Sequence, residues 1–280
     1  MRSTAGCMRK NMENDRNRAL SLSQIKSVEL EILRYFKDFC ERENIKYFLS
    51  NGTLLGAVKY GGFIPWDDDI DVFVPREDYN RLISIFEDTE RYCLFSFERN
   101  KKYRFPFAKL CDMTTEKVEE NIENGVKLGL DIDIFPLDMW EDNYDSACKQ
   151  VHRINNKIKL LAFLKCGKAL SVNPLKRFIK NIVLYLMRGA AVPLIRNWHA
   201  VRIEANVPKW LGCVVWCIYG LREIIPADVF SSTVSVLFEG DEYPAPSGYD
   251  VYLRSLYGDY TKDPPKERQT THHRFSAYWL

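Results

Sequence analysis

The sequence predicts an α+β protein in which helices flank a mixed β-sheet. Helix-like and strand-like patterns follow one another over about residues 21–142, in an order that favours an α+β or α/β sheet domain. An acidic segment at residues 66–71 leads directly into a short apolar strand, and a second acidic strand follows at residues 131–138. Neighbouring strands of one sheet would bring these carboxylates together, so we expect a polar site on the sheet.

The composition is that of an ordinary globular protein. With 46% apolar and 28% charged residues, the 280-residue chain is long enough for one large domain or two small ones. Its 40 basic and 38 acidic residues give a net charge of +2, so we expect no nucleic-acid partner. The eight cysteines include no pair with the spacing of a zinc knuckle or thioredoxin-like motif, so we expect reduced thiols.

The leader, residues 1–20, is expected to be flexible. Residues 1–18 are basic and polar and lack the apolar stretch of a secretory signal peptide. A cytoplasmic location is therefore expected, where disulfides are rare.

The first helix is expected after Ser21 or Ser23, because either serine can cap it and apolar residues then recur at helical spacing from Ile25 to Phe39. A short strand is predicted at residues 45–49. The turn that follows leads into a shorter helix, which ends at Gly61 and Gly62.

Pro75 closes the strand predicted at residues 70–74 and opens a helix over residues 76–87. Further strands are predicted at residues 92–97, 107–111 and 130–135. These elements make up the predicted catalytic core, residues 21–142.

A basic helical insert is predicted at residues 143–224. Between residues 146 and 203 the sequence has twelve Lys or Arg and no Asp or Glu. Its most apolar part, residues 182–195, is interrupted by Arg188 and is shorter than the roughly 20 residues that a membrane-spanning helix needs. The insert is expected either to lie on an anionic membrane without crossing it or to be a helical subdomain with cationic outer faces. The last segment, residues 225–280, is rich in Tyr, Pro and charge and is predicted to fold back as a lid that completes the active site.

The acidic segment has the pattern of a metal site. On a strand Asp67, Asp69 and Asp71 would share one face, while Asp68 and Ile70 would point the other way. Crowded carboxylates repel one another unless a cation neutralises them, and oxygen ligands suit Mg²⁺ or Mn²⁺. A solvated acidic turn is the competing interpretation, but unpaired charges would be costly beside an apolar strand that is expected to be buried.

Two further features accompany this segment. One carboxylate of the second acidic strand, Asp131, Asp133 or Asp138, can face the first group, although an edge strand with a solvated face would show the same pattern. The Ser50-Asn51-Gly52-Thr53 turn can present backbone amides to an anion at a helix N-terminus, although a simple cap would also explain it. Together the three parts have the layout of a nucleotidyltransferase.

Three blocks of the sequence resemble the LicD family, which includes the fukutin-related proteins. The first contains NGTLLGAVKYGGFIPWDDDIDV, residues 51–72, followed by PREDY at residues 75–79. The second is DIFPLD at residues 133–138, and the third is spread over residues 238–273 as FEG, YD, LYGDY, PP and HH. The resemblance covers about residues 21–142 and 225–274.

This resemblance implies a nucleotidyltransferase-like fold and Mg²⁺-dependent transfer of phosphocholine from CDP-choline to a hydroxyl of a cell-surface glycan or lipid-linked glycan precursor, with release of CMP. The expected partners are a CDP-linked donor and a glycan acceptor. The cytoplasmic protein would lie peripherally at the inner face of the cytoplasmic membrane if the basic insert binds anionic lipid. Transfer of ribitol phosphate or glycerol phosphate is the nearest alternative. An inactive scaffold that binds glycan or membrane is the other.

The resemblance also implies residue roles. Asp69 and Asp71 would hold the metal with help from Asp67, and Asp133 would be the catalytic base or a second metal ligand. The expected donor-binding residues are Ser50, Asn51, Gly52, Thr53, Lys59, Lys109, Arg268, His272 and His273. Arg274 is a further candidate for phosphate binding, although loop cations are commonly only solvated charges. Several C-terminal tyrosines are expected either to form a cation-π box for choline or to be packing residues.

Overall fold

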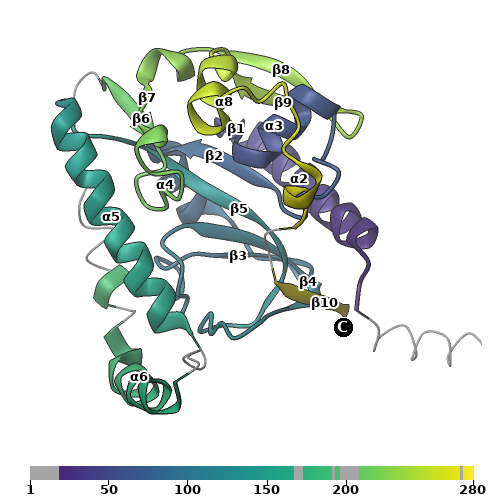
Figure 1. The fold of residues 1–280 in the computed structure, drawn as a ribbon. Coiled ribbons are helices and arrows are strands. Elements are labelled where there is room, and N and C mark those ends of the chain that lie inside the picture. The colour runs from purple at the N-terminus through teal and green to yellow at the C-terminus, as the bar shows by residue number, and fades with distance from the viewer. Residues whose placement is uncertain (1–18, 167–172, 191–192, 196–207, 272–273) are drawn as a thin grey trace, which may run out of the picture.

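The structure is a computed structural model, and it describes residues 19–166, 173–190, 193–195, 208–271 and 274–280. A curled mixed β-sheet forms its centre, and helices cover the sheet (Figure 1). The predicted α+β class is therefore confirmed. The leader through residue 18 and both histidines, His272 and His273, lie outside the described residues.

The main sheet has the strand order β1-β2-β5-β4-β10. These strands are Phe48–Leu49, Asp71–Pro75, Leu128–Met139, Ala108–Glu119 and Phe275–Trp279, respectively. β2 and β5 pair in parallel, whereas the other pairs along this path are antiparallel. Three shorter strands extend the sheet: β3 (Tyr92–Phe95) pairs with β4, and β6 (Trp210–Gly212) joins β5 to β7 (Ile225–Pro226). The parallel β2–β5 pair brings the two acidic segments side by side.

The first helix, α2 (Leu22–Glu43), packs its apolar face on β4 and β5. Ser21 caps it through a capping box with Gln24, as the sequence predicts. Further helices in the described parts of the chain are α3 (Asn51–Tyr60), α4 (Arg76–Ile85), α5 (Tyr144–Lys165), α6 (Pro174–Met187) and α8 (Tyr249–Tyr257). Short 3-10 turns lie at Arg188–Ala190, Gly220–Glu223, Ala227–Phe230 and Lys266–Arg268.

Several predicted boundaries were wrong. The strand predicted at residues 45–49 is only Phe48–Leu49, and the acidic loop, residues 67–70, precedes β2 and does not belong to it. β4 and β5 are each 12 residues long because they continue past their apolar centres into polar positions, with an irregularity between Asp112 and Lys117. Apolar runs therefore located these strands but not their ends.

The segment predicted to be a helical insert is not purely helical. α5 packs against a second apolar cluster around the buried Trp140, but β6 lies in the same segment and pairs with β5. Among the described residues, no helix is both long and apolar enough to cross a membrane.

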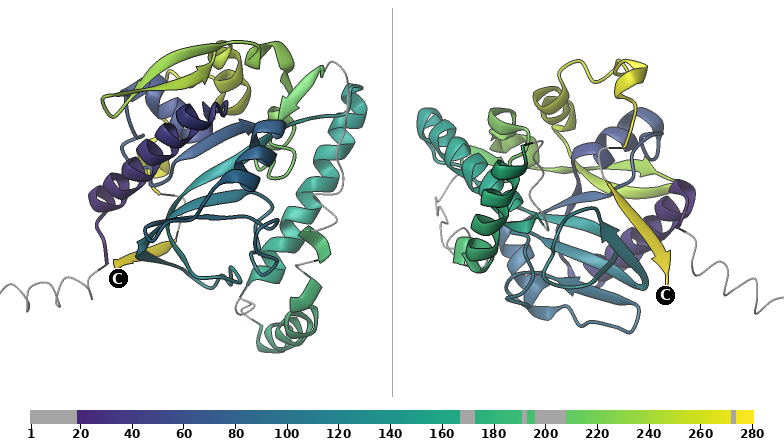
Figure 2. Two further views of the ribbon diagram at one scale, coloured as in Figure 1. Left: turned by 180° about the vertical axis from the view of Figure 1, so that it is seen from behind. Right: turned by 60° about the horizontal axis from the view of Figure 1, so that its bottom comes forward.

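The C-terminal segment packs on the core and forms regular strands and a helix (Figure 2). β8 (Thr233–Phe238) and β9 (Asp241–Pro246) form a separate hairpin, and β10 pairs with β4 at the edge of the main sheet. β9 was not predicted from the sequence because it contains prolines. They are tolerated because each strand of the hairpin has a free edge.

Candidate active site

The acidic loop gathers three carboxylates directly before β2. In Asp67, Asp68 and Asp69, one carboxylate oxygen from each side chain lies within 4.8 Å of the others. Asp68 and Ile70 are buried, whereas Asp67 and Asp69 are partly exposed, so burial alternates as the sequence predicts. Asp68 nevertheless keeps a carboxylate oxygen within 4.8 Å of those of Asp67 and Asp69, because the segment is a loop and not the predicted strand.

Close packing positions this loop. A Cβ atom on Gly52, in the first turn of α3, would lie 2.7 Å from Oδ2 of Asp67, so glycine allows the helix to approach the carboxylate. Lys26 of α2 donates hydrogen bonds from Nζ to the carbonyl oxygens of Ile64 and Pro65, at 3.0 and 3.1 Å. The loop is thus held from two helices.

Asp71 and Asp133 face each other across the parallel β2–β5 pair. Burial, followed by the charges of Asp69 and Asp133, raises the pKa of Asp71 well above its ordinary value. Asn51 supports Asp71 through a side-chain hydrogen bond, and Thr53 Oγ1 accepts a hydrogen bond from the Asp71 backbone N–H at 2.8 Å. The predicted turn and both acidic strands therefore converge on one point.

Two lysines contact the carboxylates of Asp131 and Asp133, on the second acidic strand, and the pKa values of these carboxylates are shifted in opposite directions. Lys109 forms ion pairs with Asp133 and, at 3.1 Å, with Asp131, while Lys117 lies 2.7 Å from the other oxygen of Asp131. Burial tends to raise the pKa of Asp131, but the two lysines outweigh it and lower that pKa. For Asp133 burial prevails over Lys109, and its pKa is raised.

Asp138, the third candidate on this strand, has a different partner. Arg76 binds both of its carboxylate oxygens, at 2.5 and 2.6 Å. Among the three candidates that the sequence left open, Asp133 is thus the one in register with Asp71.

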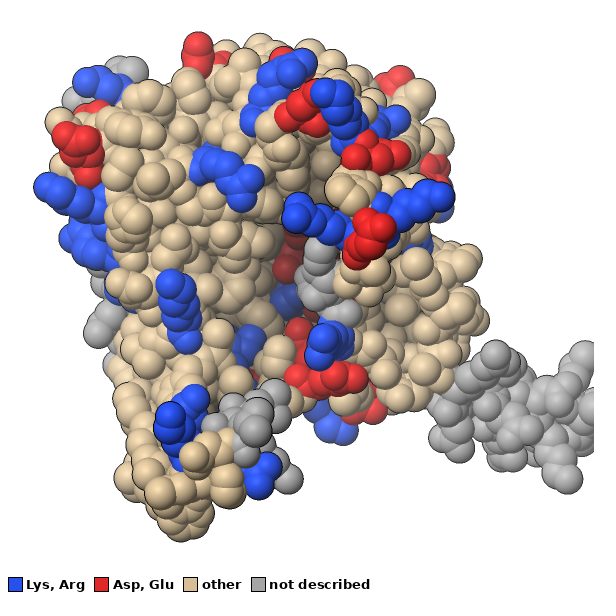
Figure 3. All heavy atoms as spheres, in the orientation of Figure 1, with Lys and Arg blue, Asp and Glu red and all other residues tan. Residues whose placement is uncertain are grey.

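A cavity of about 370 Å³ opens beside this group. Asp69, Asp133 and Lys109 line its polar side, and its apolar side is formed by Phe105, Phe107, Trp216 and Phe275. In Figure 3 the molecule is hollowed at the centre of this face, with acidic and basic side chains inside the hollow. The cavity is therefore lined by charged side chains on one side and by aromatic side chains on the other.

Comparisons with known proteins show the family of this chain. Residues 44–159 match a family described as LicD/FKTN/FKRP, nucleotidyltransferase domain. The lipopolysaccharide cholinephosphotransferase LicD of Haemophilus influenzae is 32% identical over 270 residues, which cover 93% of this chain and 99% of that protein. The chain belongs to the LicD family. It is therefore a phosphotransferase.

Other relatives match over shorter stretches. The ribitol 5-phosphate transferases FKRP of human and mouse are each 42% identical over 48 residues, which cover 17% of this chain and 10% of those proteins. An uncharacterised Rickettsia prowazekii protein is 40% identical over 74 residues, or 26% of this chain and 25% of that protein. These local matches do not distinguish phosphocholine from ribitol phosphate as the transferred group.

The residues of this LicD-family site fit a hard divalent cation. The acidic loop offers only carboxylate oxygens, which Mg²⁺ and Mn²⁺ prefer. The raised pKa of Asp71 reflects burial together with the mutual repulsion of neighbouring carboxylates, and a bound cation would relieve that repulsion.

Among the predicted donor-binding residues, Asn51 and Thr53 of the turn contact Asp71, and Lys109 contacts Asp133. Ser50 is fully buried, and its Oγ has no hydrogen-bond partner in the part of the chain that the structure describes. Lys59 forms an ion pair with Asp263 at 2.6 Å, and Arg268 lies exposed in the last 3-10 turn. Lys109 is held between two carboxylates. Arg274 is exposed just before β10.

Among the described residues, none of the C-terminal tyrosines lines this cavity. The hydroxyl of Tyr252 forms a hydrogen bond with Asn51 Oδ1 at 2.8 Å, so Tyr252 supports the turn. Tyr243 is buried between α2 and the β8–β9 hairpin. The packing interpretation therefore holds for these two residues.

Lys165 was not predicted as a site residue, because the sequence placed it only among the cations of the basic insert. It lies in the last turn of α5, is only 6% exposed and lines the cavity. Its Nζ lies 2.9 Å from the centre of the Phe105 ring, and burial lowers its pKa to about 7. The run Leu160 to Leu164 before it indicated a packed helix end, but no local signal indicated which face meets the cavity.

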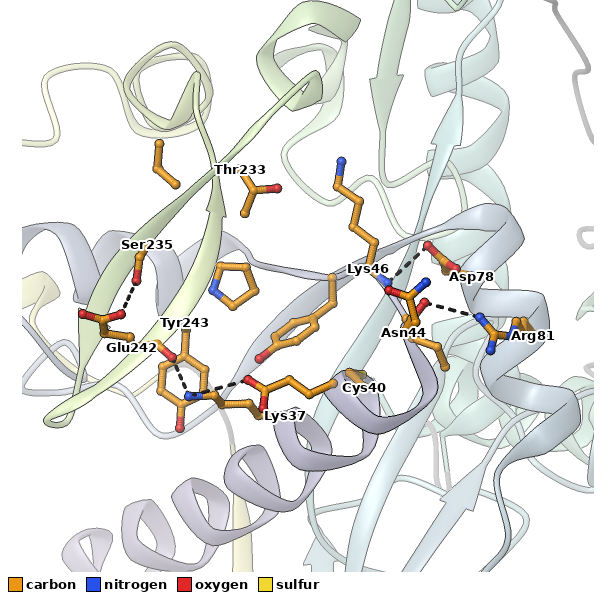
Figure 4. Close-up of a pocket in the computed structure, with 15 residues that line it drawn as sticks. Lys37, Cys40, Asn44, Lys46, Asp78, Arg81, Thr233, Ser235, Glu242 and Tyr243 are labelled. Atoms are coloured by element: carbon orange, nitrogen blue, oxygen red, sulfur yellow. Dashed lines mark hydrogen bonds and ion pairs between the residues drawn. The ribbon is translucent and has the colours of Figure 1, made fainter.

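A second, larger hollow of about 830 Å³ lies between α2, α4 and the β8–β9 hairpin (Figure 4). Basic residues Lys37, Lys46 and Arg81 alternate in its wall with Glu41 and Asp78. It includes none of the acidic-loop residues. Size alone therefore does not locate the chemistry of this protein.

Proposed function

We propose that this protein transfers phosphocholine from CDP-choline to a hydroxyl of a cell-surface glycan or of its lipid-linked precursor, with Mg²⁺ or Mn²⁺, and releases CMP. The observation that carries the proposal is the register of Asp71 with Asp133 beside the acidic loop, where Asp69 and Asp133 line a cavity. The printed activity of the Haemophilus relative, a lipopolysaccharide cholinephosphotransferase, supports the choice of transferred group and acceptor.

In the proposed reaction the acceptor hydroxyl attacks the phosphorus distal to cytidine. A new phosphorus–oxygen bond forms, the bond to the bridging oxygen breaks, and CMP leaves. Asp133 accepts the hydroxyl proton, and its raised pKa suits a base that must hold that proton. A cation at Asp67, Asp69 and Asp71 would offset the negative charge that develops on the departing phosphate.

The neighbouring side chains position these groups. Lys109 fixes the Asp133 carboxylate by an ion pair, and Asn51 orients Asp71 through its side-chain hydrogen bond. Lys165 presents a cation to the cavity where the diphosphate of the donor would lie. The aromatic walls exclude water, which strengthens these charge interactions.

A donor comparison tests the proposal. The purified protein is incubated with CDP-choline, CDP-ribitol or CDP-glycerol, Mg²⁺ and lipopolysaccharide or other glycan acceptors, and CMP release is measured. Release should be greatest with CDP-choline and should fall at least about a hundredfold in Asp133→Asn, the usual scale for loss of a catalytic base. Asp142→Asn, which alters an exposed carboxylate outside the site, should be unaffected.

The short matches to the ribitol 5-phosphate transferases favour one alternative, transfer of a phospho-polyol. Preferential CMP release with CDP-ribitol or CDP-glycerol would select it. If no CDP-linked donor gives CMP above the level of Asp133→Asn, the transferase proposal fails and the scaffold interpretation gains.

A further inference from the structure

Helix α6 presents an apolar surface to solvent. Its large apolar side chains are exposed, among them Phe178 at 63%, Tyr185 at 76% and Leu186 at 74%, and only Leu184 is buried, at 2%. Helices at the surface of soluble proteins normally show the opposite arrangement, with the apolar stripe against the core. An exposed apolar surface of this kind marks an interaction site.

The orientation of α6 on the molecule directs its apolar stripe outward. An α-helix turns by about 100° per residue, so Leu184 lies on the side opposite Ile182 and near Lys180. The buried contact is therefore made from the polar side of the helix. The outward stripe contains Leu175, Phe178, Ile179, Ile182 and Leu186, at the spacing of one helical face.

The charge on α6 indicates what covers this stripe. The helix carries Lys176, Arg177 and Lys180 and no acidic residue, and all three cations are exposed. Lys176 flanks the stripe and can reach lipid phosphates, and the net positive charge of the three cations attracts an anionic surface while the stripe enters the acyl region.

We propose that α6 docks this protein on the surface of an anionic lipid bilayer, lying in the interface with its Leu175-to-Leu186 stripe inserted. At 14 residues, or about 21 Å, the helix is too short to cross the bilayer. The inserted apolar stripe provides attachment, and the three cations provide the preference for anionic lipid.

Docking through α6 also orients the active site. α6 packs against α5, whose last turn supplies Ala162, Lys165 and Cys166 to the wall of the cavity. In Figures 1 and 2, α6 lies at the end of α5 that carries Lys165. The cavity would thus lie near the lipid surface, within reach of a lipid-linked acceptor. This use of the surface, but not the docking itself, rests on the proposed function.

Vesicle flotation with the full chain tests the docking. The protein should float with vesicles of phosphatidylglycerol and phosphatidylcholine and bind less to phosphatidylcholine alone. Phe178→Ser combined with Leu186→Ser should weaken binding at least about tenfold at low and high salt, because it removes inserted apolar area. Lys176→Gln, Arg177→Gln and Lys180→Gln together should remove the anionic preference, at about fivefold per cation.

Leu237→Ser combined with Val251→Ser is the matched control, because both residues are exposed apolar positions on other elements. This control should float as the wild type does, and melting temperatures should show that all variants fold. Binding that the Phe178/Leu186 variant retains, or no flotation by wild type, would overturn the inference. So would a lipid-free dimer, seen by light scattering, that this variant abolishes.

CMP release with a water-soluble acceptor separates docking from catalysis. The α6 variants should keep this activity. If flotation fails while CMP release persists, docking is wrong and the proposed function stands. If CMP release fails while flotation persists, the reverse holds.

Discussion

Glu29 lies on the buried face of α2, and both of its carboxylate oxygens lack a hydrogen-bond partner among the described residues. Burial raises its pKa well above the ordinary value, and the charges of Asp69 and Asp131 add to the effect although Lys117 opposes it. The folded state therefore binds the Glu29 proton more tightly than the unfolded state does. Stability should fall as the pH rises from the unfolded pKa toward the folded one.

Glu29→Gln should remove this pH dependence because the amide does not ionise. Relative to wild type, the variant should gain about 1–3 kcal/mol in free energy of unfolding between about pH 5 and about pH 8, the scale of burying an unpaired polar group. Urea unfolding in the presence of a chelator measures it. Glu41→Gln, an exposed position on the same helix, should show no such gain. Parallel pH profiles for Glu29→Gln and wild type would contradict the prediction.

Lys165 is the residue whose role changes most between sequence and structure. Because burial lowers its pKa to about 7, its charge is lost near neutral pH unless an anion in the cavity retains it. Lys165→Met should raise the KM for the CDP-linked donor by about tenfold to a hundredfold, the equivalent of a charged hydrogen bond. Initial rates of CMP release across donor concentrations measure this change.

Lys127→Met, which removes a largely exposed lysine, is the control and should leave the KM unchanged. An unchanged KM in Lys165→Met would show that this lysine does not meet the donor. A lower kcat with an unchanged KM would place its effect in the chemical step instead.

At the scale of elements, the approach of α3 to the acidic loop depends on Gly52. Alanine there would place a Cβ 2.7 Å from Asp67 Oδ2, and the carboxylate must move because it is the flexible partner. Gly52→Ala should therefore cost about 1 kcal/mol or less in stability, within the usual range for surface changes. Activity should fall about tenfold to a hundredfold, since small displacements of reacting groups are costly.

The matched control is Gly189→Ala, because a Cβ at Gly189 meets no atom within 4 Å. It should retain full activity. Chemical denaturation and CMP release on the same preparations separate the two effects. A large loss of stability in Gly52→Ala would mean that backbone strain, and not the Asp67 contact, is the reason that position 52 requires glycine.

Elements defined by local signals could be predicted from the sequence. Ser21 caps α2, Gly61 ends α3 in the left-handed conformation, and Pro75 separates β2 from α4, all as local chemistry requires. The alternating carboxylates of the acidic segments likewise indicated a site. Each of these features depends on neighbours within a few residues.

Features that depend on distant pairing could not be predicted. β10 joins the main sheet by pairing residues 275–279 with residues 115–119, and no local pattern in either segment specifies this partner. The position of Lys165 depends on how the end of α5 meets Phe105 and the β-bridge between Ile122 and Cys166, which periodicity does not encode. The outward face of α6 could not be predicted either, because an amphipathic pattern does not indicate which side of the helix contacts the protein.

For the molecule as a whole, the site is assembled from parts that are distant in the chain. α3 and the acidic loop come from one part, β4 and β5 from a second, and α5 and β10 from the rest. A ligand that binds only this assembled form stabilises the entire fold by mass action. Mg²⁺ at about 100 times its Kd should add about 2.7 kcal/mol, which raises Tm by several degrees in a chain of this size.

Replacing an acidic residue of the metal site should raise the stability of the protein without the metal and lower it with the metal. In a chelator, Asp71→Asn should be more stable than wild type, because burial and the charges of Asp69 and Asp133 already disfavour its ionised form. In Mg²⁺ the order should reverse, since the variant loses a ligand and with it most of the shift in Tm. Asp142→Asn should keep the wild-type shift. Thermal unfolding with chelator, Mg²⁺ or Mn²⁺ measures all three proteins, and a Mg²⁺ shift that survives in Asp71→Asn would remove this residue from the metal site.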